Sequence, residues 1–215
     1  HSTKNIDFYK CDLSNGNKVK IVIQKIIKKY KKIDCLVNAI GISNENSFID
    51  NIDKNYLEIG VQRGITFVQI KCNNKDSVDP YPILEGINRV NFKTTSDDFF
   101  ETKIQKKYDY IFIDGLHECH QALKDFKNSY NNLNKNGIIF FDDVLPQNKN
   151  EQIIPVSSVT GPCTGDIWKL IYHILIHKGT FDISYISSFV NMNSECRGMF
   201  VMKFNTLDNN NFFEN

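Results

Sequence analysis

Acidic residues at the ends of apolar segments are the part of this 215-residue chain that could do chemistry. Several short apolar runs resemble buried strands, and each is closed or closely followed by an aspartate or glutamate. Ligands of open α/β sheets bind beyond the carboxyl ends of the strands. We therefore expect one site to be lined by Glu58, Asp79, Asp97, Asp114, Asp142 and Asp143.

A glycine turn follows the first of these strands, with the form acid-x-Gly-x-x-x-Gly. Gly60 and Gly64 permit a tight turn and let a ligand approach the backbone closely. The adjacent carboxylate of Glu58 would repel a phosphate, but it suits an ammonium group. Asp79 is placed to accept both hydroxyls of a ribose, and Asp97 to meet an adenine amino group. This set favours a positively charged adenosine ligand without phosphates, and S-adenosylmethionine is such a ligand.

Alternating strand and helix patterns must position these acids. Helices are predicted from Cys119 to Leu133, stopped by Asn136 and Gly137, and over 167–177. Strands are predicted at 56–59, 76–79, 90–93, 108–113, 138–141, 181–187 and 198–204. The pattern predicts an α/β, Rossmann-like three-layer sandwich, with a mostly parallel seven-stranded sheet and a C-terminal antiparallel hairpin.

Residues 53–204 resemble the class I S-adenosylmethionine-dependent methyltransferases, and within them the small sugar or natural-product O-methyltransferases. The most specific part is Tyr110–Glu118, which contains Asp-Gly-Leu-His, together with the Asp-Asp pair after the next strand. The resemblance continues in the family's order through 56–61, 77–81, 95–100, 136–143 and 165–169.

The resemblance implies roles for the acids that follow the fourth and fifth strands. In related metal-dependent sugar O-methyltransferases these positions hold magnesium, and here they are Asp114, Asp142 and Asp143. Carboxylate oxygens are the ligands that Mg²⁺ prefers. His117 matches the general base that takes the proton from the acceptor hydroxyl. Asp114 is then both a catalytic residue and a cofactor contact.

Each of these residues also has a structural interpretation. His117 could cap the following helix, and Asp114 could only fix the geometry of its turn. Asp142 and Asp143 could be solvated strand-end or helix-capping acids. Trp168 could belong to the core or line the substrate pocket.

Residues 5–50 resemble a different family, the short-chain dehydrogenases. Asp12-Leu13-Ser14 and Asn38-Ala39-Ile40-Gly41 match two of that family's segments, but the glycine-rich dinucleotide turn and a downstream Tyr-x-x-x-Lys are missing. We predict a dehydrogenase-like strand-helix-strand fragment at 1–52, a methyltransferase domain at 53–206 and a flexible tail at 207–215. The chain begins with His1 rather than methionine, so we expect a partial or processed gene product.

The composition excludes several classes of protein. A net charge of +1 disfavours nucleic-acid binding, and 41% hydrophobic residues disfavour a disordered chain. The six cysteines are scattered singly, which indicates a reducing, cytoplasmic setting rather than a zinc or disulfide scaffold. No apolar run approaches the ~18 residues of a membrane span. The sequence leaves a homo-oligomer open.

Three functions follow from these observations. The first is S-adenosylmethionine-dependent O-methylation of a sugar or natural-product hydroxyl with Mg²⁺ assistance, so that the partner is a small-molecule or glycan acceptor. The second is a short-chain dehydrogenase fragment that binds NAD(P). The third is a methyltransferase-like binding protein without turnover.

Overall fold

The computed structural model describes residues 53–83, 90–176, 182–186 and 197–204, together with positions 21, 22, 24, 25, 28 and 29. The chain divides into two compact units, His1–Val37 and Asn38–Asn215. The described positions of the first unit are helical, in agreement with the helix of the strand-helix-strand fragment expected there. The strands predicted in that unit and the C-terminal tail lie outside the described residues, and the proposed domain bounds stay a prediction.

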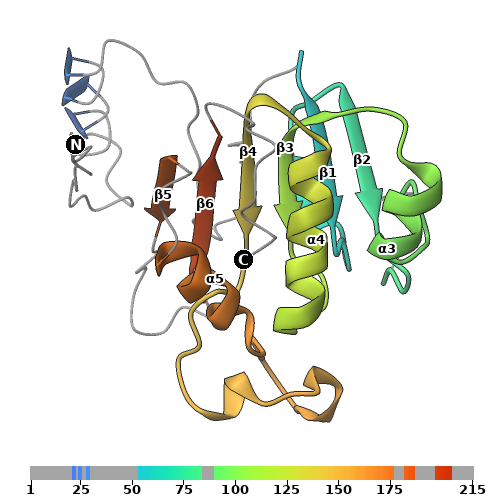
Figure 1. Ribbon diagram of the computed structural model, residues 1–215, viewed down its shortest axis with the longest axis vertical. Helices are drawn as coiled ribbons and strands as arrows, with labels where there is room; N and C mark the ends of the chain where they lie inside the picture. Colours follow the sequence, from blue (N-terminus) through green and yellow to red (C-terminus); the bar gives the residue numbers. More distant parts are fainter. Residues whose placement is uncertain are drawn as a thin grey trace. The chain divides into compact units, whose positions relative to one another are not determined.

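The second unit is built on one sheet, which has six strands among the residues that the structure describes. Their order across the sheet is β2-β1-β3-β4-β6-β5 (Figure 1). The first four strands run parallel, whereas β6 pairs antiparallel with both β4 and β5. The strands are β1 (Asn55–Ile59), β2 (Asn74–Val78), β3 (Tyr108–Ile113), β4 (Leu133–Phe141), β5 (Asp182–Ile186) and β6 (Met199–Lys203).

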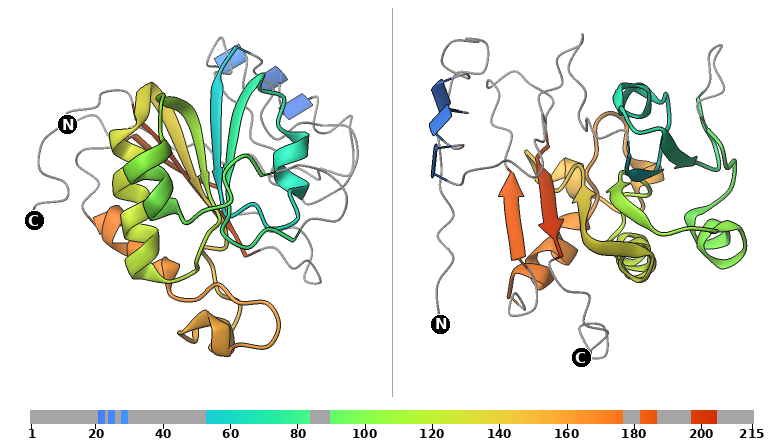
Figure 2. Two further views of the ribbon diagram at one scale, coloured as in Figure 1. Left: turned by 90° about the vertical axis from the view of Figure 1, so that its right-hand side faces the viewer. Right: turned by 90° about the horizontal axis from the view of Figure 1, so that it is seen from above.

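Helices lie on both faces of this sheet, which gives the expected three layers. Figure 2 shows α4 and α5 on one face and the short α2 on the other. Two short turns of 3₁₀-helix interrupt the loop between β4 and α5. The helices are α2 (Ile65–Gln69), α3 (Ser96–Asp98), the π-helical turn η1 (Phe99–Lys103), α4 (Cys119–Asn131), η2 (Asn150–Gln152), η3 (Val156–Ser158) and α5 (Ile167–Ile176).

The core lies between the sheet and α4 and α5. Phe126 of α4 packs on Phe141 of β4 with ring centroids 5.6 Å apart, and Tyr130 packs on Phe204 at 5.1 Å. Burying each such side chain contributes about 1.5–3 kcal/mol. The opposite face is apolar as well, since Phe112 and other neighbouring aromatic residues are buried there. Burial on both faces explains why these strands are continuous apolar runs.

Two predicted elements differ from the structure. The strand expected at 90–93 is reduced to one bridge, in which Phe92 pairs with Val78. The chain touches β2 there and leaves again, so the seventh strand is not confirmed. The helix expected to reach Leu133 ends at Asn131, and Leu133 instead opens β4. Because Leu133 is fully buried, its apolar character fits either element, and helical spacing alone could not distinguish them.

Candidate active site

Backbone hydrogen bonds align the carboxyl ends of the central strands. The amide of Gly60 donates to Val78 O at 2.9 Å, and the amide of Asp114 donates to Ile59 O at 2.8 Å. Gly60 has φ +83°, and a Cβ there would lie 1.9 Å from the carbonyl oxygen of Asp114. Only glycine therefore lets the end of β1 pass so close to the end of β3.

Asp79 braces the glycine turn. Its carboxylate accepts the amide of Gln62 at 2.7 Å and the amide of Tyr81 at 2.8 Å. Gly64, with φ +67°, starts α2 at the far side of the same turn. The structure thus brings Asp79 and the turn together, as the sequence predicts. Whether Asp79 holds a ribose and Gly64 contacts a cofactor stays a prediction.

Glu58 is almost fully buried in β1. The hydroxyl of Tyr56 donates to its Oε2 at 2.6 Å. Burial raises the pKa of Glu58 to about 8, with a further contribution from nearby Asp114, although the Tyr56 hydrogen bond lowers it. At neutral pH the group is therefore mostly uncharged, and a cationic partner would favour its ionised form. The role predicted for Glu58 beside an ammonium group supplies such a partner.

Asp97 lies in α3 and is bound to α4. Gln121 donates to one of its oxygens at 2.9 Å and Lys124 to the other at 3.1 Å. These contacts, led by the Gln121 hydrogen bond, lower the pKa of Asp97. Its predicted contact with adenine is not tested by this arrangement, because carboxylate oxygens can accept a second hydrogen bond.

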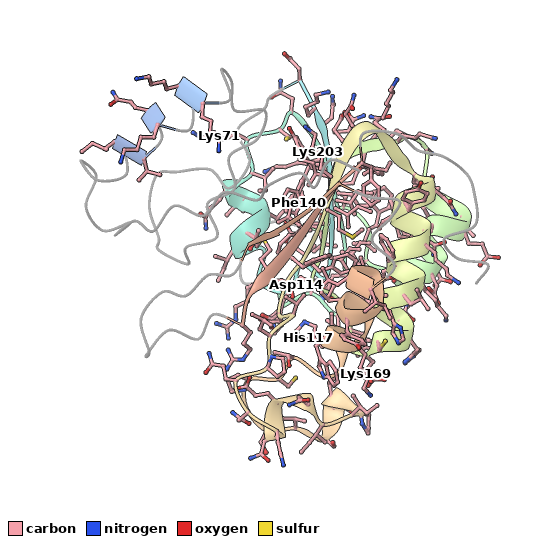
Figure 3. The ribbon with its side chains drawn as sticks, turned by 60° about the vertical axis from the view of Figure 1, so that its left-hand side comes forward. Lys71, Asp114, His117, Phe140, Lys169 and Lys203 are labelled. Atoms are coloured by element: carbon pink, nitrogen blue, oxygen red, sulfur yellow. The ribbon has the colours of Figure 1, made fainter. Side chains whose placement is uncertain are left out.

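His117 is held between a carbonyl and a carboxylate at the end of β3. Its Nδ1 lies 2.9 Å from Cys163 O, and its Nε2 lies 3.2 Å from Asp114 Oδ1 (Figure 3 labels both side chains). A carbonyl oxygen only accepts, so Nδ1 carries a proton and Nε2 is the nitrogen that can exchange one. Burial would lower the pKa of His117, but the hydrogen bond and negative charge of Asp114 raise it above its usual value.

Burial acts in the other direction on the carboxyl groups around His117, because it raises their pKa values. Partial burial raises the pKa of Asp114, and the charge of Asp142 raises it further. The pKa values of Asp142 and Asp143 are raised to about 6, mainly by burial. Three acids thus crowd around a single histidine. Groups with shifted pKa values that gather at the strand ends make this place a candidate functional site.

The expected metal triad is only partly assembled. Among the described residues, the ligand atoms that lie within 4.8 Å of one another belong to Asp114, His117 and Asp143. Asp142 instead accepts the backbone amide of Asp143 at 3.0 Å. Two carboxylates and an imidazole can hold a divalent cation, and the Nδ1 contact to a backbone carbonyl is the usual support for a histidine ligand. The set fits Mg²⁺ less well than three oxygens would.

Sequence reasoning missed the loop residues that hold this site in place. Cys163 supplies the carbonyl for His117, and the loop behind it is tied by Glu151, Asp166 and Arg197. Arg197 and Glu151 are 46 residues apart and follow no recognisable spacing. The one available signal was the length of the loop between β4 and α5, and length alone indicates no particular contacts.

Trp168 is half-exposed at the start of α5, so the structure does not place it in the core. In the described part of the chain, no helix is long and apolar enough to cross a membrane.

Comparisons with known proteins give a family match for part of the sequence and a likeness in fold. A family model described as a methyltransferase domain matches residues 57–144. No curated protein matches the sequence. The solved structures that match share the fold and little sequence.

Three of these structures illustrate the likeness. The cofactor-bound protein Rv0187 from MTB has a TM-score of 0.52 at 12% identity, covering 71% of this chain and 73% of that one. The SAH-bound methyltransferase PaMTH1 from Podospora anserina has 0.50 at 15%, covering 70% and 71%. An O-methyltransferase from Bacillus cereus in complex with SAH has 0.46 at 16%, covering 70% and 73%.

The family match spans β1 through the end of β4, including Glu58, Gly60, Asp114, His117 and Asp142. It confirms the resemblance seen in the sequence over that segment. Residues 57–144 therefore form a methyltransferase domain with the Rossmann-like fold of the class I S-adenosylmethionine-dependent methyltransferases.

Proposed function

We propose that the protein transfers the methyl group of S-adenosylmethionine to a hydroxyl group of a sugar or natural product, assisted by Mg²⁺. The observation that supports this most strongly is the position of His117 and Asp114 beside the Gly60 turn. The ends of β1 and β3 meet there, so a cofactor on the glycine turn would have its reactive end close to His117.

The reaction needs one proton acceptor. The acceptor oxygen forms a bond to the methyl carbon as the carbon–sulfur bond breaks, and S-adenosylhomocysteine leaves. The hydroxyl proton passes to Nε2 of His117, which must first be neutral. The Nδ1 hydrogen bond to Cys163 O keeps the proton of the neutral ring on Nδ1, so Nε2, which faces Asp114, is the nitrogen that receives the new proton. Asp114 orients the ring and stabilises the imidazolium that forms.

A bound Mg²⁺ would lower the pKa of the acceptor hydroxyl. We propose Asp114, Asp142 and Asp143 as its ligands, as the sequence predicts. Asp114 and Asp143 already lie close enough together, whereas Asp142, whose Oδ1 accepts the amide of Asp143, would have to bring an oxygen toward them. The single, scattered cysteines of the sequence support a cytoplasmic setting for this activity. The acceptor would be a small molecule or a glycan rather than a nucleic acid.

Calorimetric titration with S-adenosylmethionine, S-adenosylhomocysteine and NAD, each with and without Mg²⁺, tests this proposal. We expect micromolar binding of the two adenosyl compounds and none of NAD. Asp79→Ala should weaken that binding, while Asp109→Asn, at the opposite end of the strands, should not. Binding of NAD alone would favour the dehydrogenase reading, and binding of S-adenosylmethionine without methyl transfer to any hydroxyl compound would favour a binding protein.

The metal is tested separately, with Mn²⁺ as a paramagnetic probe. The spectrum of bound Mn²⁺ should appear with the native protein and disappear in Asp114→Asn. Equal binding by both proteins would show that the ion does not bind at Asp114, and it would leave the proposal of methyl transfer unaffected.

A further inference from the structure

The loop between β4 and α5 reaches outward from the carboxyl ends of the strands (orange in Figure 1). Its first residues remain attached to the sheet. The amide of Val144 donates to Gly198 O at 3.2 Å, and the amide of Leu145 donates to Arg197 O at 2.6 Å. The loop therefore starts beside the segment that leads into β6.

Glu151 connects three segments of this region. Its carboxylate accepts Nε and Nη2 of Arg197 at 3.1 and 3.2 Å, a two-pronged ion pair with both side chains buried. The same carboxylate accepts the amide of Gln147 at 2.9 Å and the side-chain amide of Asn148 at 3.1 Å. The backbone carbonyl of Glu151 accepts the amides of Thr164 and Gly165, both at 2.9 Å.

The segment fixed by Glu151 holds His117. Asp166 donates its amide to His117 O at 3.2 Å, and a Cβ at Gly165 would lie 1.6 Å from that same oxygen. Two residues before Gly165, Cys163 presents the carbonyl that accepts Nδ1 of His117. Residues 163–166 thus touch the histidine at its backbone and at its ring, and their own position depends on Glu151.

We propose that the buried Glu151–Arg197 pair is a positioning element for His117: it fixes residues 163–166, which set the tautomer and orientation of the imidazole. This inference rests on the proposed function, in which His117 Nε2 receives the proton. A buried ion pair is a weak device for stability alone, because desolvation offsets most of its attraction. The two hydrogen bonds from the Arg197 guanidinium fix the distance between Glu151 in the loop and the segment that leads into β6.

The test compares Arg197→Lys and Glu151→Gln with the native full-length chain. Arg197→Lys keeps the charge and loses the fork, so it isolates geometry from electrostatics. Asp109→Asn is the matched control, since it breaks an ion pair with Lys54 at the opposite end of the strands. Three quantities are measured: the melting temperature, binding of S-adenosylhomocysteine, and the ¹⁵N and ¹H resonances of the His117 ring, assigned with His117→Gln.

We expect the Nδ1–H signal of His117 to move or broaden in both loop variants and not in Asp109→Asn. Binding of S-adenosylhomocysteine should change less than about twofold, while kcat with any acceptor that the native protein methylates should fall about tenfold or more. An unchanged His117 signal in a folded Arg197→Lys variant would overturn the proposal. If Glu151→Gln does not fold, the charge-preserving variant alone decides.

The outcomes separate this inference from the proposed function. If the native protein neither binds S-adenosylhomocysteine nor transfers methyl groups, the proposed function fails, yet the ring signals still report whether the pair positions His117. If binding and transfer occur but the His117 ring signals are unchanged in the Glu151 and Arg197 variants, only the positioning role is contradicted.

Discussion

Two neighbouring regions hold carboxyl groups in opposite electrostatic states. In the loop between β4 and α5, Glu151 and Asp166 are buried, yet hydrogen bonds and cationic partners lower their pKa values despite the burial. At the strand ends, Asp114 and Asp142 are half-buried, and their pKa values are raised. The difference lies in the partners: the loop acids meet backbone amides, Arg197 and Lys169. At the strand ends, Asp114 meets His117, and Asp142 lies beside Asp143, whose charge raises the pKa of Asp142 further.

This contrast distinguishes the carboxyl groups that hold the loop in place, the framework, from those at the strand ends that could bind a ligand or exchange a proton. Fixed donors keep the loop carboxylates ionised, and these carboxylates hold segments of the chain together. Crowded acids with few donors gain when a cation or a proton arrives, which makes their region the place where binding and proton transfer are favourable. The loop and the strand ends touch at His117, so the framework positions the reactive group.

Substitutions at the strand ends should break the chemistry and leave the framework intact. We expect Asp114→Asn and His117→Ala each to reduce methyl transfer by at least ~10²-fold, because they remove the orienting acid and the base. The measurement is formation of S-adenosylhomocysteine with an acceptor that the native protein methylates. Binding of S-adenosylhomocysteine to His117→Ala should persist, which shows that the fold survives. Unchanged transfer in both variants would contradict the assignment of the site.

The order of the elements and the acids at the strand ends were predictable from the sequence, because both depend on local patterns. Apolar runs such as Tyr108–Ile113 identify buried strands, and the residue after a strand must lie at the sheet's edge. The glycine at position 60 was expected to let a ligand approach the backbone, whereas the structure shows that the backbone of Asp114 is what approaches it closely.

The rest depended on distant contacts that leave no local pattern. Phe92 forms one bridge instead of a strand because hydrogen bonding to β2 stops after a single residue. His117 replaces Asp142 in the converging cluster because the Asp142 carboxylate accepts the amide of Asp143 and Cys163 directs the ring toward Asp114. Such contacts set the direction of a side chain beyond the strand end, and this direction cannot be predicted from the spacing of residues along the chain.

Cofactor binding should depend on pH through Glu58, which shares the raised pKa of the strand-end acids. Its pKa of about 8 means that the folded protein must lose a proton there before a carboxylate faces the ligand's ammonium group. We therefore expect S-adenosylhomocysteine to bind about tenfold more weakly at pH 6.5 than at pH 8. Calorimetry in buffers of different ionisation enthalpy should detect proton release on binding.

Glu58→Gln provides the control for this dependence, since its amide cannot titrate. Its affinity should vary little over the same pH range. If the variant keeps the pH dependence of the native protein, another group is responsible, and Glu58 does not face the ammonium group.

The smallest expected effect is on stability and concerns Asp166, one of the buried acids in the loop between β4 and α5. Asp166 accepts the amide of Cys119 at 2.6 Å and pairs with Lys169 at 2.8 Å. Since its pKa is lowered on folding, its ionised form stabilises the protein above the unfolded pKa of about 4, and this contribution is lost as the pH falls. Asp166→Asn should thus lower the free energy of unfolding by about 1 kcal/mol at pH 7 and by less near pH 3.

Asp125, buried in α4 beside the Gly115 turn, should respond with the opposite sign. Burial raises its pKa to about 6, so its ionisation costs stability as the pH rises from about 4 to 6. Asp125→Asn should therefore gain about 1 kcal/mol or more at pH 8 and nothing near pH 4. Denaturant unfolding of both variants at these pH values measures the two effects. Equal signs would show that the partners of a carboxyl do not divide framework from site in this fold.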